Sequence, residues 1–359
     1  IQHFIYFSSR ANNSFVYNPY NFYVCKNSLR VSIDIKTCQS NLRIWFHGCF
    51  YSITIYCWFT KSCKWFILSY VEKQVLDSPF TKKEYLNLVK QFNGAQDIIF
   101  DDFAISKKTI VNIGNRDFVD YRPTIHISSK IIKDNSISKI DLDSLHYFQI
   151  QKILENDVYK SITVKKADVS VNLILPHLYE DYLQNLTKKN RHELNRKKRK
   201  FLDQIDSYEL SESKEKEIFN IFVSQHKNSK GEKGKFMTKD IEAYFENLLK
   251  LDGWKIYYLQ TNKGVVSTAF CYENKKGCYL YNSSRDNRFN LLNPGIVLND
   301  LIIQHLIDNK KSFFDFLKGT ERYKFDLGGE TVQLYDLSIH LWKFYRSVFI
   351  QPLLVMLVS

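Results

Sequence analysis

The second half of the chain shows the clearest pattern of apolar and polar positions. Three runs rich in aromatic and β-branched residues, at 254–260, 265–273 and 278–284, are separated by the loops TNKG and NKKG, which end in glycine as hairpin turns do. The segment 293–309 then carries apolar residues at helical spacing behind an Asn and a Pro, a typical helix start. An apolar run at 312–317 follows. We expect three antiparallel strands, a helix, and a strand that returns parallel to the third.

The pattern upstream predicts further helices and strands. Helical spacing predicts helices at 78–92, 140–157, 176–205, 212–225 and 238–250. Short apolar runs between polar turns predict strands at 98–105, 109–114 and 124–129. The helix at 176–205 has an apolar stripe made of Leu178, Tyr182, Leu186, Leu194 and Phe201. Helices and strands alternate through most of the chain, which indicates an α/β protein with a mixed (α+β) sheet.

The chain of 359 residues is long enough for two domains. We expect a half-domain at 71–165 that packs against a larger domain at 166–335, followed by a tail at 336–359. Residues 1–70 differ from the rest because they hold 18 aromatic residues and a single acid, Asp34. Their longest apolar run, 44–60, is shorter than the roughly 20 residues that a spanning helix needs. Three interpretations stay open: an unstructured extension, a membrane anchor, or translated sequence that is not native protein.

The net charge of +13 is concentrated in two places. Residues 1–70 carry seven Lys and Arg against Asp34, and residues 188–200 carry eight against Glu193. Together these segments account for the whole net charge, so the body of the protein is neutral. This argues against a nucleic-acid-binding protein, as does the lack of aromatic residues for base stacking in the basic segment.

Five of the seven cysteines lie in the first 63 residues, and no pair has CxxC spacing. We therefore expect no metal site. The odd cysteine count and the lack of a clear signal peptide indicate a reducing compartment, the cytoplasm.

The start of the helix at 293–309 is the first candidate binding site. The crossover places it at the end of the strand 278–284. Backbone N–H groups without partners and the helix dipole make such a start suitable for a pyrophosphate. The residues concerned are Asn293, Gly295, Ile296 and Val297, and Arg285 and Arg288 lie in the preceding loop. The alternative is an ordinary helix start.

Three stretches, taken in order, resemble the CelD/cellulose-biosynthesis type of the GNAT superfamily, which is similar to FemAB-like proteins. They are LTKKNRHELNRKKRKF, the segment FVSQHKNSKGEKGKF, and LLNPGIVL followed by FDFLKGTERYKFDL. Lys318 stands where that family usually has Arg, and Leu327 lies near a position where an aromatic residue is common. The two-glycine loop of better-known GNAT enzymes is absent from the sequence, and Gly295 alone serves here. The resemblance implies a GNAT-type acyltransferase fold, with a second GNAT-like half-domain on its N-terminal side.

The resemblance also implies an N-acyltransferase that moves an acyl group, typically acetyl, from acyl-CoA to an amine. The expected acceptor is a small molecule such as an amino sugar in polysaccharide or cell-envelope synthesis, and the expected location is cytoplasmic or on the inner membrane face. An aminoacyl-tRNA-dependent ligase of the Fem kind is the alternative. In either case the carbonyl would lie between the strands 278–284 and 312–317, where a backbone N–H stabilises its developing charge.

The candidate catalytic residues are His226, Asp315 and Tyr323. His226 has a suitable intrinsic pKa for a general base and matches the family's His, and Asp315 is the second candidate. The alternatives are a surface or capping role for His226 and an ion pair with Lys324 or Arg322 for Asp315. Tyr323 and Tyr281 are candidate proton donors to sulfur, or packing residues.

The candidate substrate-binding residues are Arg191, Arg196, Tyr281 and Lys324. Arg191 and Arg196 lie in the basic segment, which would bind an anionic acceptor such as a nucleotide sugar or a lipid-linked sugar, or the phosphates of coenzyme A. The alternative is a solvated face balanced by the nearby acids of SESKEKE. Lys324 would hold a substrate anion or pair with Asp315.

Overall fold

A computed structural model of the chain describes residues 75, 77–92, 98–99, 103–122, 137–155, 159–229 and 231–341. The chain divides into two compact units, Ile1–Lys73 and Gln74–Ser359. The first unit and the end of the chain after Leu341 lie outside the described residues, as does the strand predicted at 124–129. None of the described helices is long and apolar enough to cross a membrane.

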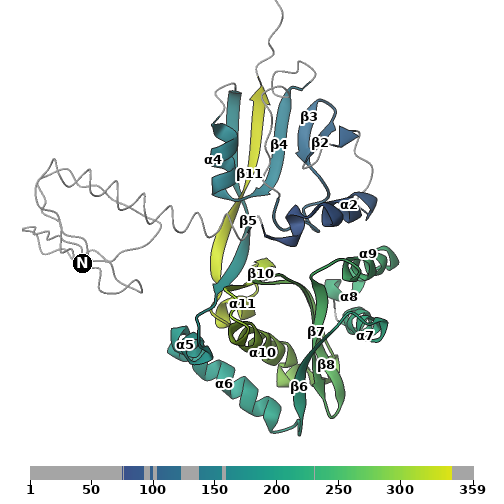
Figure 1. Cartoon of the computed structure of the whole chain (residues 1–359), viewed down its shortest axis with the longest axis vertical. Helices are drawn as coiled ribbons and strands as arrows, with labels where there is room; N and C mark the ends of the chain where they lie inside the picture. Colours follow the sequence, from purple (N-terminus) through teal and green to yellow (C-terminus); the bar gives the residue numbers. More distant parts are fainter. Residues whose placement is uncertain are drawn as a thin grey trace, which may run out of the picture. The chain divides into compact units, whose positions relative to one another are not determined.

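Within the second unit, eleven strands form one sheet in the order β1-β2-β3-β4-β11-β5-β10-β9-β8-β7-β6. Figure 1 shows two lobes joined by the long strands β5 and β11. The N-terminal lobe comprises η1 (Pro79–Thr81), α2 (Lys83–Phe92), β1 (Ile98–Ile99), β2 (Phe103–Ser106), β3 (Thr109–Asn112), β4 (Lys139–Leu145) and α4 (Tyr147–Leu154). The linking strands are β5 (Tyr159–Ile174) and β11 (Glu330–Leu341).

The C-terminal lobe holds the remaining elements. Its strands are β6 (Tyr208–Ser213), β7 (Trp254–Thr261), β8 (Gly264–Glu273), β9 (Gly277–Arg285) and β10 (Phe313–Lys318). Its helices are α5 (Tyr179–Asn185), α6 (Lys188–Leu202), α7 (Lys216–Lys227), α8 (Glu232–Phe236), α9 (Lys239–Leu249), η2 (Asn287–Leu292), α10 (Pro294–Asp308) and α11 (Arg322–Asp326). Figure 1 shows α7, α8 and α9 on one face of the strands and α10 and α6 on the other.

The strands β5 and β11 belong to both lobes. Their antiparallel pairing runs from Glu330 opposite Asn172 to Leu341 opposite Tyr159. At one end β11 also pairs with β4, and at the other β5 pairs with β10. The boundaries expected at 165/166 and 335/336 therefore fall inside these strands.

The elements predicted for the second half are confirmed. The hairpins β7–β8 and β8–β9 are antiparallel, and β10 returns parallel to β9 after α10. The apolar face of α10 packs in a core that includes Leu298, Ile302 and Leu306.

Several other predictions are wrong at their boundaries. The helix predicted at 140–157 begins with a strand, β4. Its residues Ile140, Leu142 and Ser144 are buried and alternate with half-buried ones, which is the period of a strand. The helix predicted at 212–225 starts after the edge strand β6, whose mostly exposed residues give little apolar signal. The helix predicted at 176–205 is broken because Thr187 is the N-cap of a new helix and accepts a bond from Asn190 N–H. The segment 78–92 likewise divides into η1 and α2.

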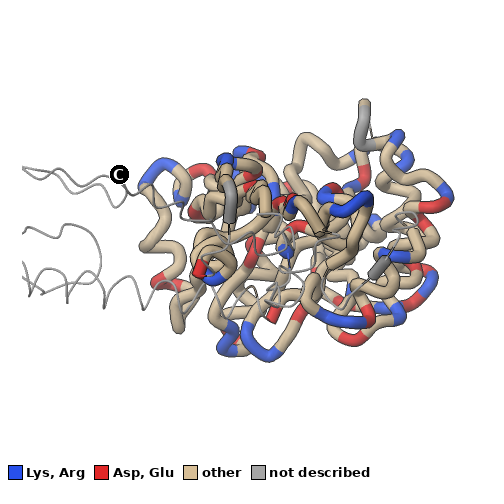
Figure 2. Tube along the Cα trace, turned by 90° about the horizontal axis from the view of Figure 1, so that it is seen from above, with Lys and Arg blue, Asp and Glu red and all other residues tan. Residues whose placement is uncertain are grey.

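The basic helix α6 is attached to α10 by a buried ion pair. Lys198 Nζ lies 2.6 Å from Oδ2 of Asp300, a side chain with no exposed surface. Tyr179 from α5 donates to the other carboxylate oxygen at 2.6 Å. The charge of Lys198 therefore has a structural role. Figure 2 shows that basic and acidic residues are both spread over the rest of the unit.

Candidate active site

The strands β9 and β10 separate part of the way along their length. They pair only from Phe313 opposite Gly277 to Asp315 opposite Tyr279, although β9 continues to Arg285. On its other side, β9 has a register shift against β8 at Tyr281, since Phe270 pairs with Asn282 and Cys271 pairs with Leu280. The gap expected between the two strands is therefore present, and backbone on this part of β9 has no β10 partner.

β10 turns away from β9 through a strained segment. Its pairing with β5 shifts between Asp315 and Lys318, where Leu317 has a φ of 58° and Gly319 a φ of 105°. Asp315 stabilises this bulge because its Oδ1 accepts a bond from Leu317 N–H at 2.8 Å. Lys324 holds the segment from the other side by donating to the carbonyl oxygen of Lys318 at 2.5 Å.

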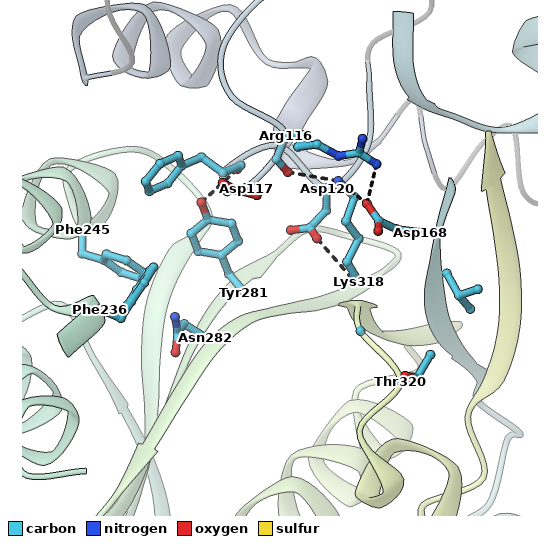
Figure 3. Close-up of a pocket in the computed structure, with 13 residues that line it drawn as sticks. Arg116, Asp117, Asp120, Asp168, Phe236, Phe245, Tyr281, Asn282, Lys318 and Thr320 are labelled. Atoms are coloured by element: carbon cyan, nitrogen blue, oxygen red, sulfur yellow. Dashed lines mark hydrogen bonds and ion pairs between the residues drawn. The ribbon is translucent and has the colours of Figure 1, made fainter. Parts of the chain in front are cut away.

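A cavity of about 610 Å³ lies at this gap and between the two lobes. We call it the interlobe cavity (Figure 3). It is lined by Arg116, Asp117, Phe118, Asp120, Asp168, Val169, Phe236, Phe245, Tyr281, Asn282, Lys318, Gly319 and Thr320. Its volume is in the range of small-molecule sites, and it combines aromatic rings with convergent charges.

The cations of the interlobe cavity are already paired. Arg116 lies 2.8 Å from Asp168 and 3.4 Å from Asp336. Lys318 Nζ donates to the Arg116 carbonyl oxygen at 3.0 Å and to Ser144 Oγ at 2.9 Å, and it lies 3.7 Å from Asp168. Burial lowers the pKa of the Lys318 ammonium. The cavity therefore offers little positive charge to a ligand.

Asp120 is the carboxylate best placed to take a proton. Its Oδ1 accepts a bond from Lys318 N–H at 3.2 Å, at the point where β10 ends. Burial raises the pKa of Asp120, and the nearby Lys318 only partly offsets this. A carboxylate with a raised pKa beside the strand gap has the properties of a general base.

Three tyrosine hydroxyls hold the loop that carries Asp120. Tyr281 OH and Tyr85 OH both donate to the Phe118 carbonyl oxygen, the first at 2.9 Å. Tyr244 OH lies 3.0 Å from Tyr85 OH and 3.2 Å from Tyr281 OH. Because Tyr281 and Tyr244 belong to the C-terminal lobe, the N-terminal lobe supplies part of a site whose other walls lie on β9 and β10.

None of the three residues predicted to be catalytic lines the interlobe cavity. His226 is 1% exposed, and its Nε2 lies 2.7 Å from Oδ1 of Asn282, which does line the cavity. Asp315 has no exposed surface and accepts a bond from Tyr121 OH at 2.7 Å. Tyr323 packs edge-on against Phe316, and burial raises its pKa.

The residues predicted to bind substrate are spread over separate places. Tyr281 lines the interlobe cavity. Arg191 donates to the Leu183 carbonyl oxygen at 3.2 Å, and Arg196 forms a two-pronged ion pair with Glu193 of its own helix. Lys324 lies under the β10 bulge and pairs with Glu321 at 2.9 Å. The structure thus brings only Tyr281 of this set into the cavity.

The residues predicted to bind the cofactor lie together at the start of α10. Asn293 adopts the left-handed conformation, and Ile296 and Val297 N–H both bond to its carbonyl oxygen. A Cβ at Gly295 would meet only Ser267 Oγ at 3.9 Å, so neither its conformation nor its packing requires glycine. The prediction of free N–H groups is therefore wrong for Ile296 and Val297, and also for Asn293, whose N–H bonds to the Asn290 carbonyl oxygen. Of the four predicted residues, Gly295 alone has open space that fits the approach of a diphosphate.

The two arginines near this start face a second cavity. Arg285 and Arg288 line a space of about 760 Å³ together with α7 and the β7–β8 turn. Arg288 is paired with Asp286 at 2.6 Å, and Arg285 Nε donates to Asn290 at 2.6 Å. Both side chains would have to change partners before they could contact a phosphate.

Arg116, Asp117, Asp120 and Lys318 line the cavity but were not predicted as site residues. Lys318 falls within the motif FDFLKG, so its position in that pattern was a signal. The loop NRDFVD, which carries the other three, follows a short strand and mixes polar residues with Phe and Val, so it has no local pattern that marks a site.

A further cluster of polar side chains lies at β6, β8 and α10. Glu212, Glu273 and His305 place potential metal-ligand atoms within 4.8 Å of one another. However, Lys255 bonds to both glutamates, and Lys311 lies 2.7 Å from Glu273. These lysines favour an ion-pair network over a metal site.

Comparison with known proteins identifies part of this architecture. Residues 188–325 match the model of a family described as an acetyltransferase (GNAT) domain. No curated protein matches the chain.

Two solved structures are similar in fold. FemX is 11% identical, with a TM-score of 0.51 over 75% of this chain and 94% of its own. A conserved protein of unknown function from Bacteroides thetaiotaomicron is also 11% identical, with a TM-score of 0.48 over 74% of this chain and 92% of its own. The predicted mixed α/β fold of the GNAT type is confirmed, and the chain contains a GNAT acetyltransferase-like domain. The CelD-type specificity stays a prediction.

Proposed function

We propose that the protein transfers an acyl group from acyl-CoA to an amine acceptor in the interlobe cavity. The observation that carries this proposal is the position of Asp120. This carboxylate of the N-terminal lobe, whose pKa is raised by burial, borders the gap between β9 and β10. Those two strands belong to the region 188–325 that matches an acetyltransferase family. The acyl-CoA would place its diphosphate at Gly295 and its thioester in the gap.

The charges of the cavity favour an amine. Asp117 and Asp120 face the cavity, while Arg116 and Lys318 are paired with other groups. An ammonium group would be attracted by these carboxylates and by the ring faces of Phe236, Phe245 and Tyr281.

The proposed reaction follows from these positions. Asp120 accepts a proton from the ammonium group, and the amine nitrogen attacks the thioester carbonyl carbon. The new C–N bond forms, the C–S bond breaks, and the thiolate leaves with coenzyme A and takes up the proton that the attacking nitrogen loses. The part of β9 beyond Tyr279 is not paired with β10, and a backbone N–H group there would stabilise the developing oxyanion. In this scheme His226 acts through Asn282, whose amide it contacts, and Asp315 acts by stabilising the β10 bulge at Leu317.

The test is thiol release by the purified full chain with acetyl-CoA and a panel of amines that includes glucosamine and galactosamine. We expect turnover, and we expect Asp120→Asn to lower kcat by about 100-fold or more. The matched control is Asp308→Asn, an exposed carboxylate at the end of α10 that does not line the cavity, for which we expect a loss below about twofold. Equal activity of Asp120→Asn and the wild type would refute the assignment of the base.

The same assay separates the alternatives. Absence of thiol release with every amine, together with consumption of aminoacyl-tRNA, would establish a Fem-like ligase instead. Tight, salt-sensitive nucleic-acid binding without either turnover would indicate a binding protein.

A further inference from the structure

The side-chain amide of Asn282 has a fixed orientation. Its Oδ1 accepts a hydrogen bond from Ser283 N–H at 2.7 Å. A backbone N–H can only donate, so the atom that faces it must be the oxygen and not the nitrogen. The assignment of the two amide atoms therefore follows from the chemistry of their neighbours.

The same oxygen determines the role of His226. Nε2 of His226 lies 2.7 Å from Asn282 Oδ1, and since that oxygen can only accept, Nε2 must carry a proton and donate it. The imidazole is held between the rings of Phe222 and Phe236, whose centroids are 5.0 Å and 6.1 Å away. His226 is therefore a positioning residue for the amide, and its Nε2 is not available to act as a base.

The Asn282 nitrogen is left as a donor at the cavity wall. Asn282 lines the interlobe cavity, and Figure 3 shows its nitrogen on the Tyr281 side and its oxygen turned away. The neighbouring wall is aromatic, because Phe236 contacts Phe245 and Phe245 contacts Tyr281, at centroid distances of 6.4 Å and 5.6 Å.

The cavity therefore has two chemically different parts. The loop from the N-terminal lobe brings the carboxylates of Asp117 and Asp120, and the C-terminal lobe brings aromatic surface with one amide donor. A ligand that fits both parts has an ammonium group, an apolar ring face and an oxygen lone pair.

We propose that Asn282, held by His226, selects the acceptor by donating a hydrogen bond to an oxygen atom of an amine-bearing ring. The acceptor class is an amino sugar or another hydroxylated cyclic amine, and simple alkylamines are rejected. This inference rests on the proposed acyl transfer. A donor that loses its acceptor in a partly buried site discriminates against the analogue without the oxygen.

The test compares two amines of similar ring size, glucosamine and cyclohexylamine, as acceptors for acetyl-CoA. For the wild-type full chain we expect kcat/KM to favour glucosamine by about 100-fold or more. Asn282→Ala should lower kcat/KM for glucosamine by roughly 10-fold and leave cyclohexylamine unchanged. Asn247→Ala, which removes the same amide from α9, is the control and should keep the wild-type ratio.

The positioning role of His226 has its own test. His226→Ala should reduce the ratio between the two amines, because the amide of Asn282 then keeps only the bond from Ser283 N–H and is held less firmly. His226→Gln keeps a side-chain N–H donor and should restore the ratio. Circular dichroism of each variant establishes that it is folded.

The outcomes distinguish this inference from the function on which it rests. If no amine releases thiol, the proposed acyl transfer fails. If the wild type acetylates both amines equally well, or if Asn282→Ala keeps the wild-type ratio, acyl transfer stands and selection by Asn282 is refuted.

Discussion

Replacement of Lys198 by Met tests whether the basic helix is held by one buried charge. The change leaves the Asp300 carboxylate, which has no exposed surface, without its cation. Removing one partner of a buried ion pair costs about 3–5 kcal/mol. Because Lys198 is 26% exposed and Tyr179 continues to donate to Asp300, we expect the lower end of that range, about 3 kcal/mol.

Unfolding entropy is about 2.1 cal/mol/K per residue, so for the unit Gln74–Ser359 this loss corresponds to a fall in Tm of about 5 °C. Urea and thermal unfolding of the full chain, followed by circular dichroism, measure it. Arg199→Met removes the same charge from an exposed position of α6 and should leave the midpoint unchanged. The double variant with Asp300→Asn should recover part of the loss, since no unpaired charge then stays buried.

The reasoning would be wrong if Lys198→Met and Arg199→Met had equal midpoints. It would also be wrong if the double variant were as unstable as Lys198→Met alone.

Three further predictions concern the site and its support. Burial raises the pKa of Asp120, and its charged form is the base. In a pH–rate profile, kcat/KM should therefore rise at a higher pH than for an ordinary carboxylate, and Asp120→Asn should abolish that rise. Gly295→Ala should leave Tm unchanged or higher, because the added Cβ meets no close neighbour. It should raise KM for acetyl-CoA at least about fivefold if the diphosphate lies on that turn, and an unchanged KM would exclude this site. Burial lowers the pKa of His146 to about 3, so the stability that it contributes is present above about pH 6.5 and is lost as pH falls toward 3. Urea midpoints measured between pH 7 and 4 should therefore fall less for His146→Phe than for the wild type.

The sequence predicts the C-terminal lobe well because its signals are local. The strands β7, β8 and β9 are joined by short turns that end in glycine, and α10 begins with a proline. The strands β4, β5, β6 and β11 were not predicted. β5 and β11 pair with each other although they are far apart in the sequence. β4 leads almost directly into α4 after the turn at Ser144, which has a φ of 54°, so the two were predicted as one helix. β6 is an edge strand whose residues are exposed or half-buried, so it lacks an apolar pattern.

The candidate site is less predictable because it depends on contacts between distant residues. The loop that carries Asp120 is held by Tyr281, which lies 163 residues away from its acceptor Phe118. The pattern around FDFLKG indicates the β10 end of the site, but no local feature indicates which loop faces it. Similarly, no local signal shows that His226 contacts Asn282 and does not line the cavity.

The shared strands limit how ligands enter. The pairing of β5 with β11 extends from one lobe to the other, and the loop of the N-terminal lobe is bonded directly to β9 through Tyr281. A clamshell motion of the lobes would have to shear that ladder and break this bond. We therefore expect a ligand of the interlobe cavity to enter a preformed chamber without hinge opening of the lobes.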